Sequence, residues 1–467
     1  MNQRPPQSPR VAVVGGGLAG LAASCALAGS GFHVTLFERR PYLGGRASSY
    51  QHPGTGEVVD NCQHVLLGCC TNLIQFYERL DVEDKIRWYD RLTFLEPGGR
   101  ASVIEPSKLP APFHNAPAFL RAVCLGLSDK LAIGMAMAAL APSTPRDTGE
   151  SFLAWLRRHQ QTKQAIERFW KPVLVSALNE ELDRMSVPYA AQVVRESFLK
   201  SAAAGRMGVP TVPLTELYSV AGDYITAHGG EIRFRCSVDS FLAQPDKVTV
   251  QVSGEVASFD FVVFAVPFDV LSRILPQTSV ADPLRRVLAR FETSPITGIH
   301  LWFDRQITDL DHAVLLDRTI QWMFHKSKLL GRDENGSGSY VELVVSSSKT
   351  LVEKSRAEII ELALAELREF FPGARDAKLV KSTVIKEVHA TYSPQPGMDF
   401  YRPKPETVWP RVFLAGDWTA TGWPATMEGA VRSGYMAAES VARVAGIRDA
   451  SFLVPNLPAS GFMRLFG

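Results

Sequence analysis

The chain has few cysteines, no strong excess of charge of one sign, and no apolar run long enough to span a bilayer. Its 467 residues include six cysteines, none in the paired C-x-x-C sets that typically hold zinc. The formal net charge is +2 and no basic tract carries interleaved aromatic residues, so the sequence does not predict nucleic-acid binding. The most apolar segment beyond the N-terminal region, residues 131–142, is shorter than the roughly 20 apolar residues of a spanning helix. We therefore expect a globular protein with a large core.

The N-terminal segment combines a strand, a glycine triad, a helix and an acid in the order typical of dinucleotide binding. The valine-rich run Val11–Val14 predicts a buried parallel strand, and Gly15, Gly17 and Gly20 then form G-x-G-x-x-G. The first glycine permits a tight turn, the second lets the backbone approach a pyrophosphate, and the third lets helix and strand pack closely. Glu38 ends the second expected strand, where it can accept hydrogen bonds from ribose hydroxyls.

A second glycine pair follows that acid. Arg39 comes directly after it, and Gly44, Gly45 and Arg46 lie a few residues further on. The pair predicts another close approach of the backbone, and Arg46 would supply charge-assisted hydrogen bonds near the phosphates or the ring of the cofactor. The pattern resembles the flavoprotein family of amine oxidases and phytoene desaturases. In that family the glycine–arginine segment lies along FAD, so the resemblance implies FAD as the cofactor, with Arg39 among its binding residues.

The resemblance extends to the middle and the C-terminal end of the chain. It implies that Gly416 and Asp417, in "RVFLAGDW", close the FAD site, with the acid binding the ribityl chain. The helix expected from Met427 would point its N-terminus at the pyrimidine end of the flavin, where negative charge accumulates on reduction. Thr426 precedes that helix and belongs with the cofactor-binding residues. Val238 matches the family residue whose backbone meets adenine.

These segments predict an α/β protein with a Rossmann-type FAD-binding domain and an inserted substrate domain of mixed sheet and apolar helices. The FAD-binding domain would comprise residues 1–105, 215–275 and 405–447, the substrate domain residues 106–214 and 276–404, and a C-terminal tail residues 448–467. Apolar or alternating residues in 295–305 and 339–348 predict a second sheet. Residues 115–141 predict a long, nearly all-apolar helical region, which would be a buried core helix, a membrane-dipping helix or the wall of a lipid tunnel.

A narrower resemblance concerns the reaction. Residues 60–64, Asp-Asn-Cys-Gln-His, and the segments "ALNEELDRMSVPYAAQVVRESF" and "VPLTELY" resemble bacterial hydroxysqualene dehydroxylases of the same superfamily, and Cys62 replaces the usual glycine of Asp-x-Gly. The resemblance implies reduction of hydroxysqualene to squalene, in squalene and hopanoid biosynthesis, with an external reductant for the flavin. Asp60 and His64 are candidates for the acid that helps hydroxide leave. The alternatives are a backbone-bonding turn residue for Asp60 and a core histidine for His64.

Three other functions stay open: carotenoid desaturation, amine oxidation and non-enzymatic carriage of prenyl lipids. Thr426 stands where amine oxidases usually carry a tyrosine, and the loss of that aromatic face disfavours an amine substrate. The glycine–arginine segment and Asp417 disfavour a carrier without flavin. Because a polyprenoid is nearly insoluble in water, we expect a cytoplasmic protein bound peripherally to the inner face of a bacterial cytoplasmic membrane.

Overall fold

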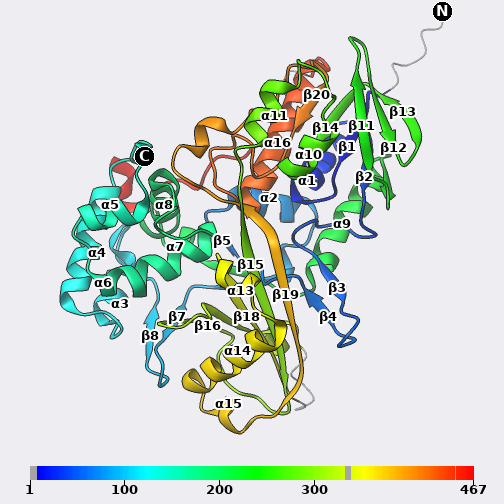
Figure 1. The fold of residues 1–467 in the computed structure, drawn as a ribbon. Helices are drawn as coiled ribbons and strands as arrows, with labels where there is room; N and C mark the ends of the chain where they lie inside the picture. Colours follow the sequence, from blue (N-terminus) through cyan, green and yellow to red (C-terminus); the bar gives the residue numbers. More distant parts are fainter. Residues whose placement is uncertain (1–7, 332–337, 448, 467) are drawn as a thin grey trace, which may run out of the picture.

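The first of two large sheets carries the N-terminal glycine segment. The structure is a computed structural model that describes residues 8–331, 338–447 and 449–466 (Figure 1). This sheet has five strands in the order β10-β2-β1-β14-β20, all parallel. Its strands are β10 (Glu231–Phe234), β2 (His33–Glu38), β1 (Arg10–Val14), β14 (Phe261–Phe264) and β20 (Val412–Leu414). Burial on both faces explains the nearly continuous valine and phenylalanine runs of the central strands.

Helices cover one face of this sheet, and a β-meander covers the other. The helices are α1 (Leu18–Ala28), α2 (Thr71–Arg79), α9 (Leu214–Ala227) and α16 (Met427–Val444). The opposite face holds β11 (Val238–Ala243), β12 (Val248–Val252), β13 (Glu255–Phe259), α10 (Phe268–Ile274) and α11 (Asp282–Leu288). The sheet is therefore the middle layer of three, with its strand ends open toward the rest of the molecule.

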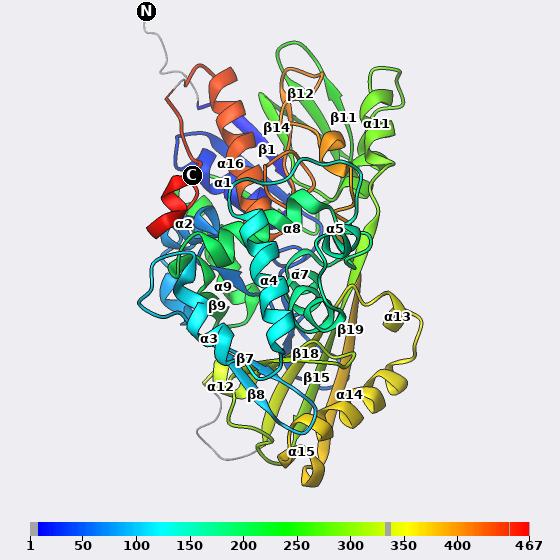
Figure 2. The same cartoon turned by 90° about the vertical axis from the view of Figure 1, so that its left-hand side faces the viewer.

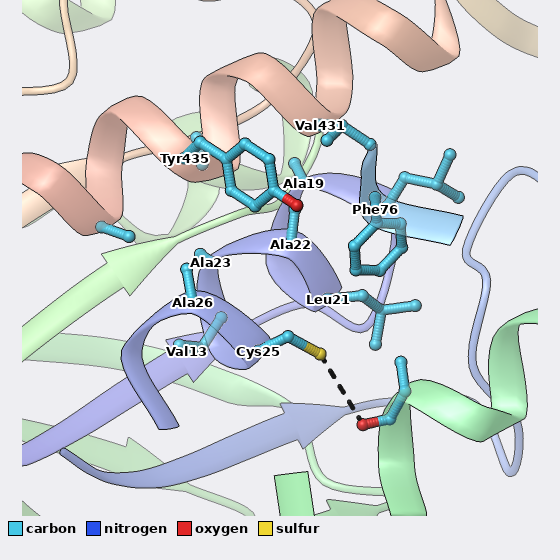
Figure 3. Close-up of a cluster of buried hydrophobic side chains, with 14 of the residues drawn as sticks. Val13, Ala19, Leu21, Ala22, Ala23, Cys25, Ala26, Phe76, Val431 and Tyr435 are labelled. Carbon is cyan, nitrogen blue, oxygen red and sulfur yellow. Dashed lines mark hydrogen bonds between the residues drawn. The ribbon is translucent and has the colours of Figure 1, made fainter. Parts of the chain in front are cut away.

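Helices α1 and α16 lie close together, although α1 ends at Ala28 and α16 begins at Met427. A Cβ built on Gly434 would stand 2.2 Å from the carbonyl oxygen of Ala19. Figure 3 shows Ala19, Ala22 and Ala23 of α1 beneath α16, with Tyr435 beside them. Small residues on both helices permit this approach, which fixes the C-terminal helix against the nucleotide-binding segment.

The second sheet has seven strands in the order β19-β15-β18-β17-β16-β7-β8. Its strands are β19 (Leu379–Tyr392), β15 (Thr293–Phe303), β18 (Ser339–Ser346), β17 (Trp322–His325), β16 (His312–Leu315), β7 (Leu92–Leu95) and β8 (Ala101–Ile104). The expected second sheet is confirmed, since β15 and β18 pair as antiparallel neighbours. Its helices are α12 (Lys326–Leu329), α13 (Lys349–Val352), α14 (Arg356–Phe370) and α15 (Gly373–Asp376), and α14 contributes several residues to the core beneath the sheet.

The expected boundary of the first domain at residue 105 requires a correction. Strand β7 pairs in parallel with β16, and the backbone N–H of Leu316 donates to the carbonyl of Leu95 at 2.9 Å. Residues 92–104 therefore belong to the second sheet. Local sequence cannot reveal this, because the partner strand lies more than 200 residues away.

A helical unit packs beside the second sheet (Figure 2). It consists of α3 (Ala116–Arg121), α4 (Leu127–Leu140), α5 (Phe152–Arg158), α6 (Lys163–Ala165), α7 (Lys171–Leu178) and α8 (Val187–Val193), with π-helical turns η3 (Ile166–Trp170) and η4 (Val194–Leu199). The prediction of one long helical region over 115–141 was wrong. The chain leaves the helix at Ala122, and the N–H groups of Val123 and Cys124 donate to the hydroxyl of Ser102 instead.

Short elements complete the fold. Strands β3 (Ser49–Gln51) and β4 (Val58–Asp60) form a hairpin, and β5 (Leu66–Leu67), β9 (Met207–Pro210) and β6 (Ile86–Tyr89) form a three-stranded sheet. The 3₁₀ turns are η1 (Glu83–Lys85), η2 (Phe113–Asn115), η5 (Ala203–Gly205), η7 (Met398–Tyr401) and η8 (Gly461–Leu465). Among the described residues, no helix has the length and apolar character needed to cross a membrane.

Substitution Gly434→Ala tests the contact between α1 and α16. The added methyl would overlap the carbonyl oxygen of Ala19, so we expect the free energy of unfolding to fall by about 1–3 kcal/mol. The matched control is Gly134→Ala in α4, where nothing lies within 4 Å of the new methyl and stability should stay level or rise by up to about 1 kcal/mol. Urea denaturation measures both, and equal effects would contradict the close contact.

Candidate active site

A large cavity lies where the first sheet, the second sheet and the helical unit meet. Residues at or after the carboxyl ends of β1, β2, β14 and β20 line one part of it. The remaining wall comes from both other units and includes Val344 and Ser346 of β18, Glu387 of β19, Val173 and Ala177 of α7, and Glu196–Phe198 of η4. Open α/β sheets bind ligands at the carboxyl ends of their strands, so this cavity is the candidate site.

The glycine segments form a cradle in which side chains would not fit. Gly15 has φ +108°, and a Cβ there would stand 2.6 Å from the carbonyl oxygen of Ala265. A Cβ on Gly45, at φ +61°, would stand 2.8 Å from the Cα of Gly17. A Cβ on Gly20 would stand 1.9 Å from the carbonyl oxygen of Gly15; this glycine serves the packing of α1 and does not line the cavity. Bare backbone therefore faces the cavity at the start of α1, as a pyrophosphate requires.

Glu38 stands at the end of β2 and lines the cavity. Its carboxylate accepts hydrogen bonds from the N–H groups of Gly16 at 2.7 Å and Arg40 at 2.8 Å, which fix its orientation. Arg39 and Val238 line the same part of the cavity. The structure thus brings together the acid, the arginine and the valine assigned to the nucleotide half.

Arg46 and Asp417 meet across the cavity, although 371 residues separate them in sequence. The guanidinium donates to the carboxylate at 2.6 Å and to the carbonyl of Ala390 at 2.9 Å. Gly416 has φ +145°, and its N–H donates to the hydroxyl of Ser433 in α16 at 2.8 Å. The C-terminal acid therefore lies within the same cavity as the N-terminal glycines, as the sequence predicts.

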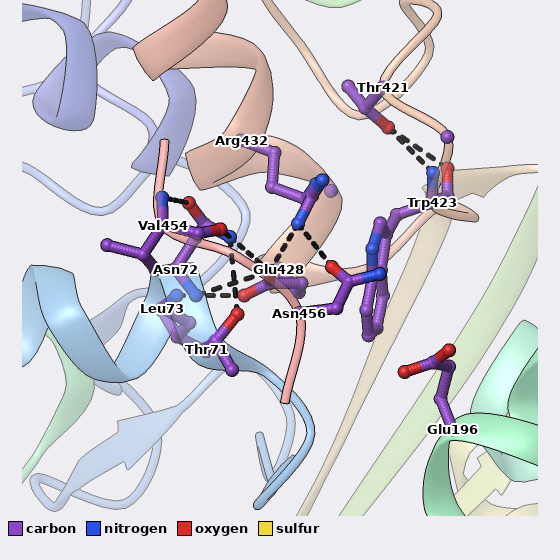
Figure 4. A network of polar contacts seen from close by, with 12 residues as sticks. Thr71, Asn72, Leu73, Glu196, Thr421, Trp423, Glu428, Arg432, Val454 and Asn456 are labelled. Atoms are coloured by element: carbon purple, nitrogen blue, oxygen red, sulfur yellow. Dashed lines mark hydrogen bonds and ion pairs between the residues drawn. The ribbon is translucent and has the colours of Figure 1, made fainter. Parts of the chain in front are cut away.

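Helix α16 begins at the cavity. Thr426 is its N-cap, and the threonine side chain accepts a hydrogen bond from the N–H of Gly429. Thr426 and Met427 both line the cavity. Glu428 also borders the cavity, and its carboxylate accepts from the N–H groups of Asn72 and Leu73 at the start of α2 (Figure 4). The positive end of α16 therefore faces the cavity, while its first acid caps another helix.

Asp60 does not line the cavity. Its buried carboxylate accepts from Nζ of Lys326 at 2.7 Å, from the Ser49 hydroxyl at 2.6 Å and from the N–H of Leu214 at 3.1 Å. Burial alone would raise the pKa of Asp60, but the lysine and the two hydrogen bonds lower it below the usual range. A carboxyl held ionised in this way is poorly suited to donate a proton, and the geometry gives Asp60 a structural position behind the cavity wall.

Lys326 is a buried residue that the sequence did not single out. Besides Asp60, its ammonium donates to the amide oxygen of Gln63 at 2.8 Å and lies 3.7 Å from the carboxylate of Glu342. Burial alone would lower the pKa of Lys326, but the two carboxylates raise it. Burial raises the pKa of Glu342 to about 8. Lys326 thus fixes residues 60–63 against the cavity, and a lone lysine after a strand offers no sequence signal for that role.

His64 does line the cavity. Its Nδ1 lies 2.7 Å from the carbonyl oxygen of Cys62, so Nδ1 carries a proton and donates it to that oxygen. Burial lowers the pKa of His64, so the ring is neutral at pH 7 with Nε2 as an acceptor. Cys62 is buried beside it, and burial raises the pKa of its thiol. His64 is therefore placed to accept a proton, and its catalytic role stays a prediction.

Comparison with known proteins gives one family and one fold. The profile described as "Flavin containing amine oxidoreductase" matches residues 18–442. A 15-cis-phytoene desaturase of Synechococcus elongatus is 27% identical over 460 residues, covering 92% of this chain and 95% of that protein. A zeta-carotene desaturase of Synechocystis is 24% identical over 475 residues, covering 92% and 97%. A solved oxidoreductase from Methanosarcina mazei superposes with a TM-score of 0.71 at 17% identity, covering 91% and 98%.

The cofactor is FAD, and both the cofactor and the α/β fold predicted from the sequence are confirmed. The residues present fit a flavin dinucleotide, because the bare glycine backbone, Glu38 and the start of α16 all border one cavity. The contact of each individual residue with FAD stays a prediction, which the structure supports by bringing these residues together.

Substitution Asp417→Ala tests the cofactor site. We expect FAD to bind roughly 10- to 100-fold more weakly while the protein stays soluble, because a charged hydrogen-bond partner is lost from the cavity. The flavin absorbance per protein after gel filtration measures retention. Asp269→Ala, which removes an acid of an exposed i,i+4 ion pair on α10, is the matched control. Full flavin content in the Asp417 variant would refute the assignment.

Proposed function

Because the chain belongs to the flavin containing amine oxidoreductase family, we propose that it exchanges a hydride between FAD and a long polyprenoid chain. Two relatives that match over more than nine-tenths of this chain and of their own lengths are named phytoene and zeta-carotene desaturase. The cavity supports an apolar substrate, because Val173, Ala177, Val344, Trp322 and Phe324 contribute to its wall away from the glycines. Desaturation of a carotenoid-type hydrocarbon is therefore the first candidate reaction.

The residues of the chain supply orientation and a dry environment for this chemistry. FAD, when bound, accepts or donates the two electrons of the hydride. Apolar walls hold the substrate by burial and exclude water, which strengthens every charge inside the cavity. The start of α16 favours negative charge nearby, and neutral His64 offers Nε2 as a proton acceptor.

Reductive dehydroxylation of hydroxysqualene is the second candidate. Its specific support is the resemblance of residues 60–64, and the structure adds that this segment borders the cavity through residues 61–64. The reaction would run in the opposite direction and would need an external reductant for FAD. Amine oxidation has less support, since Thr426 offers no aromatic face for a cation at the start of α16.

Product analysis separates the two candidates. Oxidised holoenzyme is incubated with phytoene, and chemically reduced holoenzyme with hydroxysqualene, each in detergent. Conjugated polyene from the first incubation supports desaturation, and squalene from the second supports dehydroxylation. Holoenzyme without substrate is the control, and the absence of both products would contradict hydride exchange with polyprenoids.

We further propose that the protein collects its substrate from a membrane surface. Exposed apolar side chains are frequent just before and along α3 and α4, and three of them recur every four residues on α4: Leu109, Phe113, Leu120, Val123, Leu127, Leu131 and Met135. The C-terminal turn η8 joins them, since the N–H of Phe462 donates to the carbonyl of Ala111 and the Phe462 ring lies edge-on to Phe113. Figure 2 shows α3, α4 and the C-terminal turn on the face toward the viewer. Of the three interpretations of residues 115–141, the exposed side chains of α4 support a membrane-dipping helix rather than a buried core helix or a tunnel wall.

Vesicle flotation tests this surface. The variant Leu127→Ser/Leu131→Ser should lose most of its binding to phospholipid vesicles, because two side chains 78% and 70% exposed would no longer enter the lipid. Leu242→Ser/Val256→Ser is the matched control, with equally exposed apolar residues on the β-meander. Equal flotation of the two variants would contradict the proposed face.

A further inference from the structure

A π-helical turn forms part of the cavity wall opposite the cofactor segments. In η4 (Val194–Leu199) the consecutive residues Glu196, Ser197 and Phe198 all line the cavity. π-helical turns are rare and occur frequently at functional sites. The second such turn in the described chain, η3, contributes no residue to the cavity. The two turns therefore differ in their relation to the site.

One contact joins η4 to the loop before α2, and another joins the preceding helix α8 to the loop before α16. The side-chain amide of Gln192 donates to the carbonyl of Gly422 at 2.7 Å, and the Ser197 hydroxyl lies 3.9 Å from the thiol of Cys69. Figure 4 shows the carboxylate of Glu196 on the same side as the ring of Trp423, three residues before the N-cap of α16. The turn η4 thus lies beside the loop that precedes α16.

The side chain of Glu196 is partly buried in this wall. Its carboxylate accepts from Nζ of Lys200 at 2.8 Å, and the two side chains are 16% and 18% exposed. A single ion pair leaves part of the carboxylate available toward the cavity. The wall around it is mixed, since Val193 and Phe198 line it together with Gln192 and Ser197. A partly buried carboxylate there costs desolvation free energy, which positive charge on a ligand offsets.

The other acids at the cavity lie on other elements. Glu38 is bound by backbone N–H groups, Asp417 by Arg46, and Glu428 by the start of α2. Glu387 borders the cavity from β19, the strand whose Ala390 carbonyl accepts from Arg46. Glu196 is thus the acid that the helical unit supplies to the cavity.

We propose that Glu196 exchanges a proton with the polyprenoid substrate, an inference that rests on the function proposed above. In desaturation, a hydride leaves a substrate carbon for FAD, and the cationic substrate loses a proton from the adjacent carbon to the Glu196 carboxylate, forming the double bond. In dehydroxylation, the protonated Glu196 carboxyl gives its proton to the hydroxyl oxygen. The C–O bond then breaks, water leaves, and the allylic cation accepts a hydride. In both directions the carboxylate faces positive charge on the substrate.

The first test is turnover by Glu196→Gln, which keeps shape and loses the charge. With whichever substrate the wild type converts, kcat should fall at least about 100-fold while flavin content stays unchanged. Glu196→Asp, which keeps the charge, should recover part of that loss. The matched control is Glu167→Gln, since Glu167 lies in the other π-helical turn and pairs with Lys171 at i,i+4 without lining the cavity. Its kcat should match the wild type.

The second test does not depend on turnover. Binding of a polyprenyl tertiary amine, protonated at pH 7 and of squalene length, is compared with that of squalene itself by equilibrium binding to holoenzyme. The wild type should prefer the amine at least about 10-fold, and Glu196→Gln should lose this preference while it still binds squalene.

The outcomes distinguish the inference from the function on which it rests. Binding of neither polyprenoid by the wild type would overturn the proposed function and the inference together. Normal turnover and an unchanged preference for the amine in Glu196→Gln would overturn the inference alone. A loss of turnover confined to Glu387→Gln would also overturn it, in favour of the acid on β19.

Discussion

The ion pair between Arg46 and Asp417 joins two segments that are 371 residues apart, and the candidate site depends on the pairing that brings them together. Parallel pairing of β1 with β14, and of β14 with β20, places the carboxyl ends of all three strands at one edge. Close packing of α16 on α1 then directs the start of α16 to the same edge. A cofactor bound there would be held by both ends of the chain, so cofactor binding and the folding of this sheet are coupled.

A second constraint is the buried charge cluster behind the cavity wall. Asp60, Lys326 and Glu342 come from a hairpin, a short helix and the second sheet. Burial raises the pKa of Glu342 to about 8, whereas Lys326 and two hydrogen bonds hold the pKa of Asp60 below its usual range, so Asp60 is the main anionic partner of the lysine. Removing one partner of such a pair typically costs about 3–5 kcal/mol, since the other charge stays buried. The cluster therefore specifies how segment 60–64 lies against the cavity.

The polar groups of the cavity are unevenly distributed along its wall. Backbone N–H groups, Glu38, Arg46 and Asp417 gather where the dinucleotide is expected, while the wall from the second sheet is mostly apolar and the wall from the helical unit is mixed. His64 and Glu196 are among the ionisable groups that line the cavity, and their roles in proton transfer belong to the proposed reaction. Exposed apolar residues on α3, α4 and η8 also make part of the outer surface apolar.

The sequence by itself determined the cofactor and the fold class, and most of the residues it assigned to the cofactor line one cavity in the structure. Gly15, Gly45 and Gly416 have a backbone conformation that other residues rarely adopt. This requirement concerns a few adjacent residues, so a local sequence motif is enough to predict it. Tertiary structure alone decided that β7 and β8 join the second sheet, that Ser102 interrupts the helix after Ala122, and that Lys326 holds Asp60. It also decided that Glu196, one acid among many on helices, lines the cavity. These outcomes depend on contacts between residues up to several hundred positions apart, and no local pattern encodes which distant partner a strand or a charge will meet.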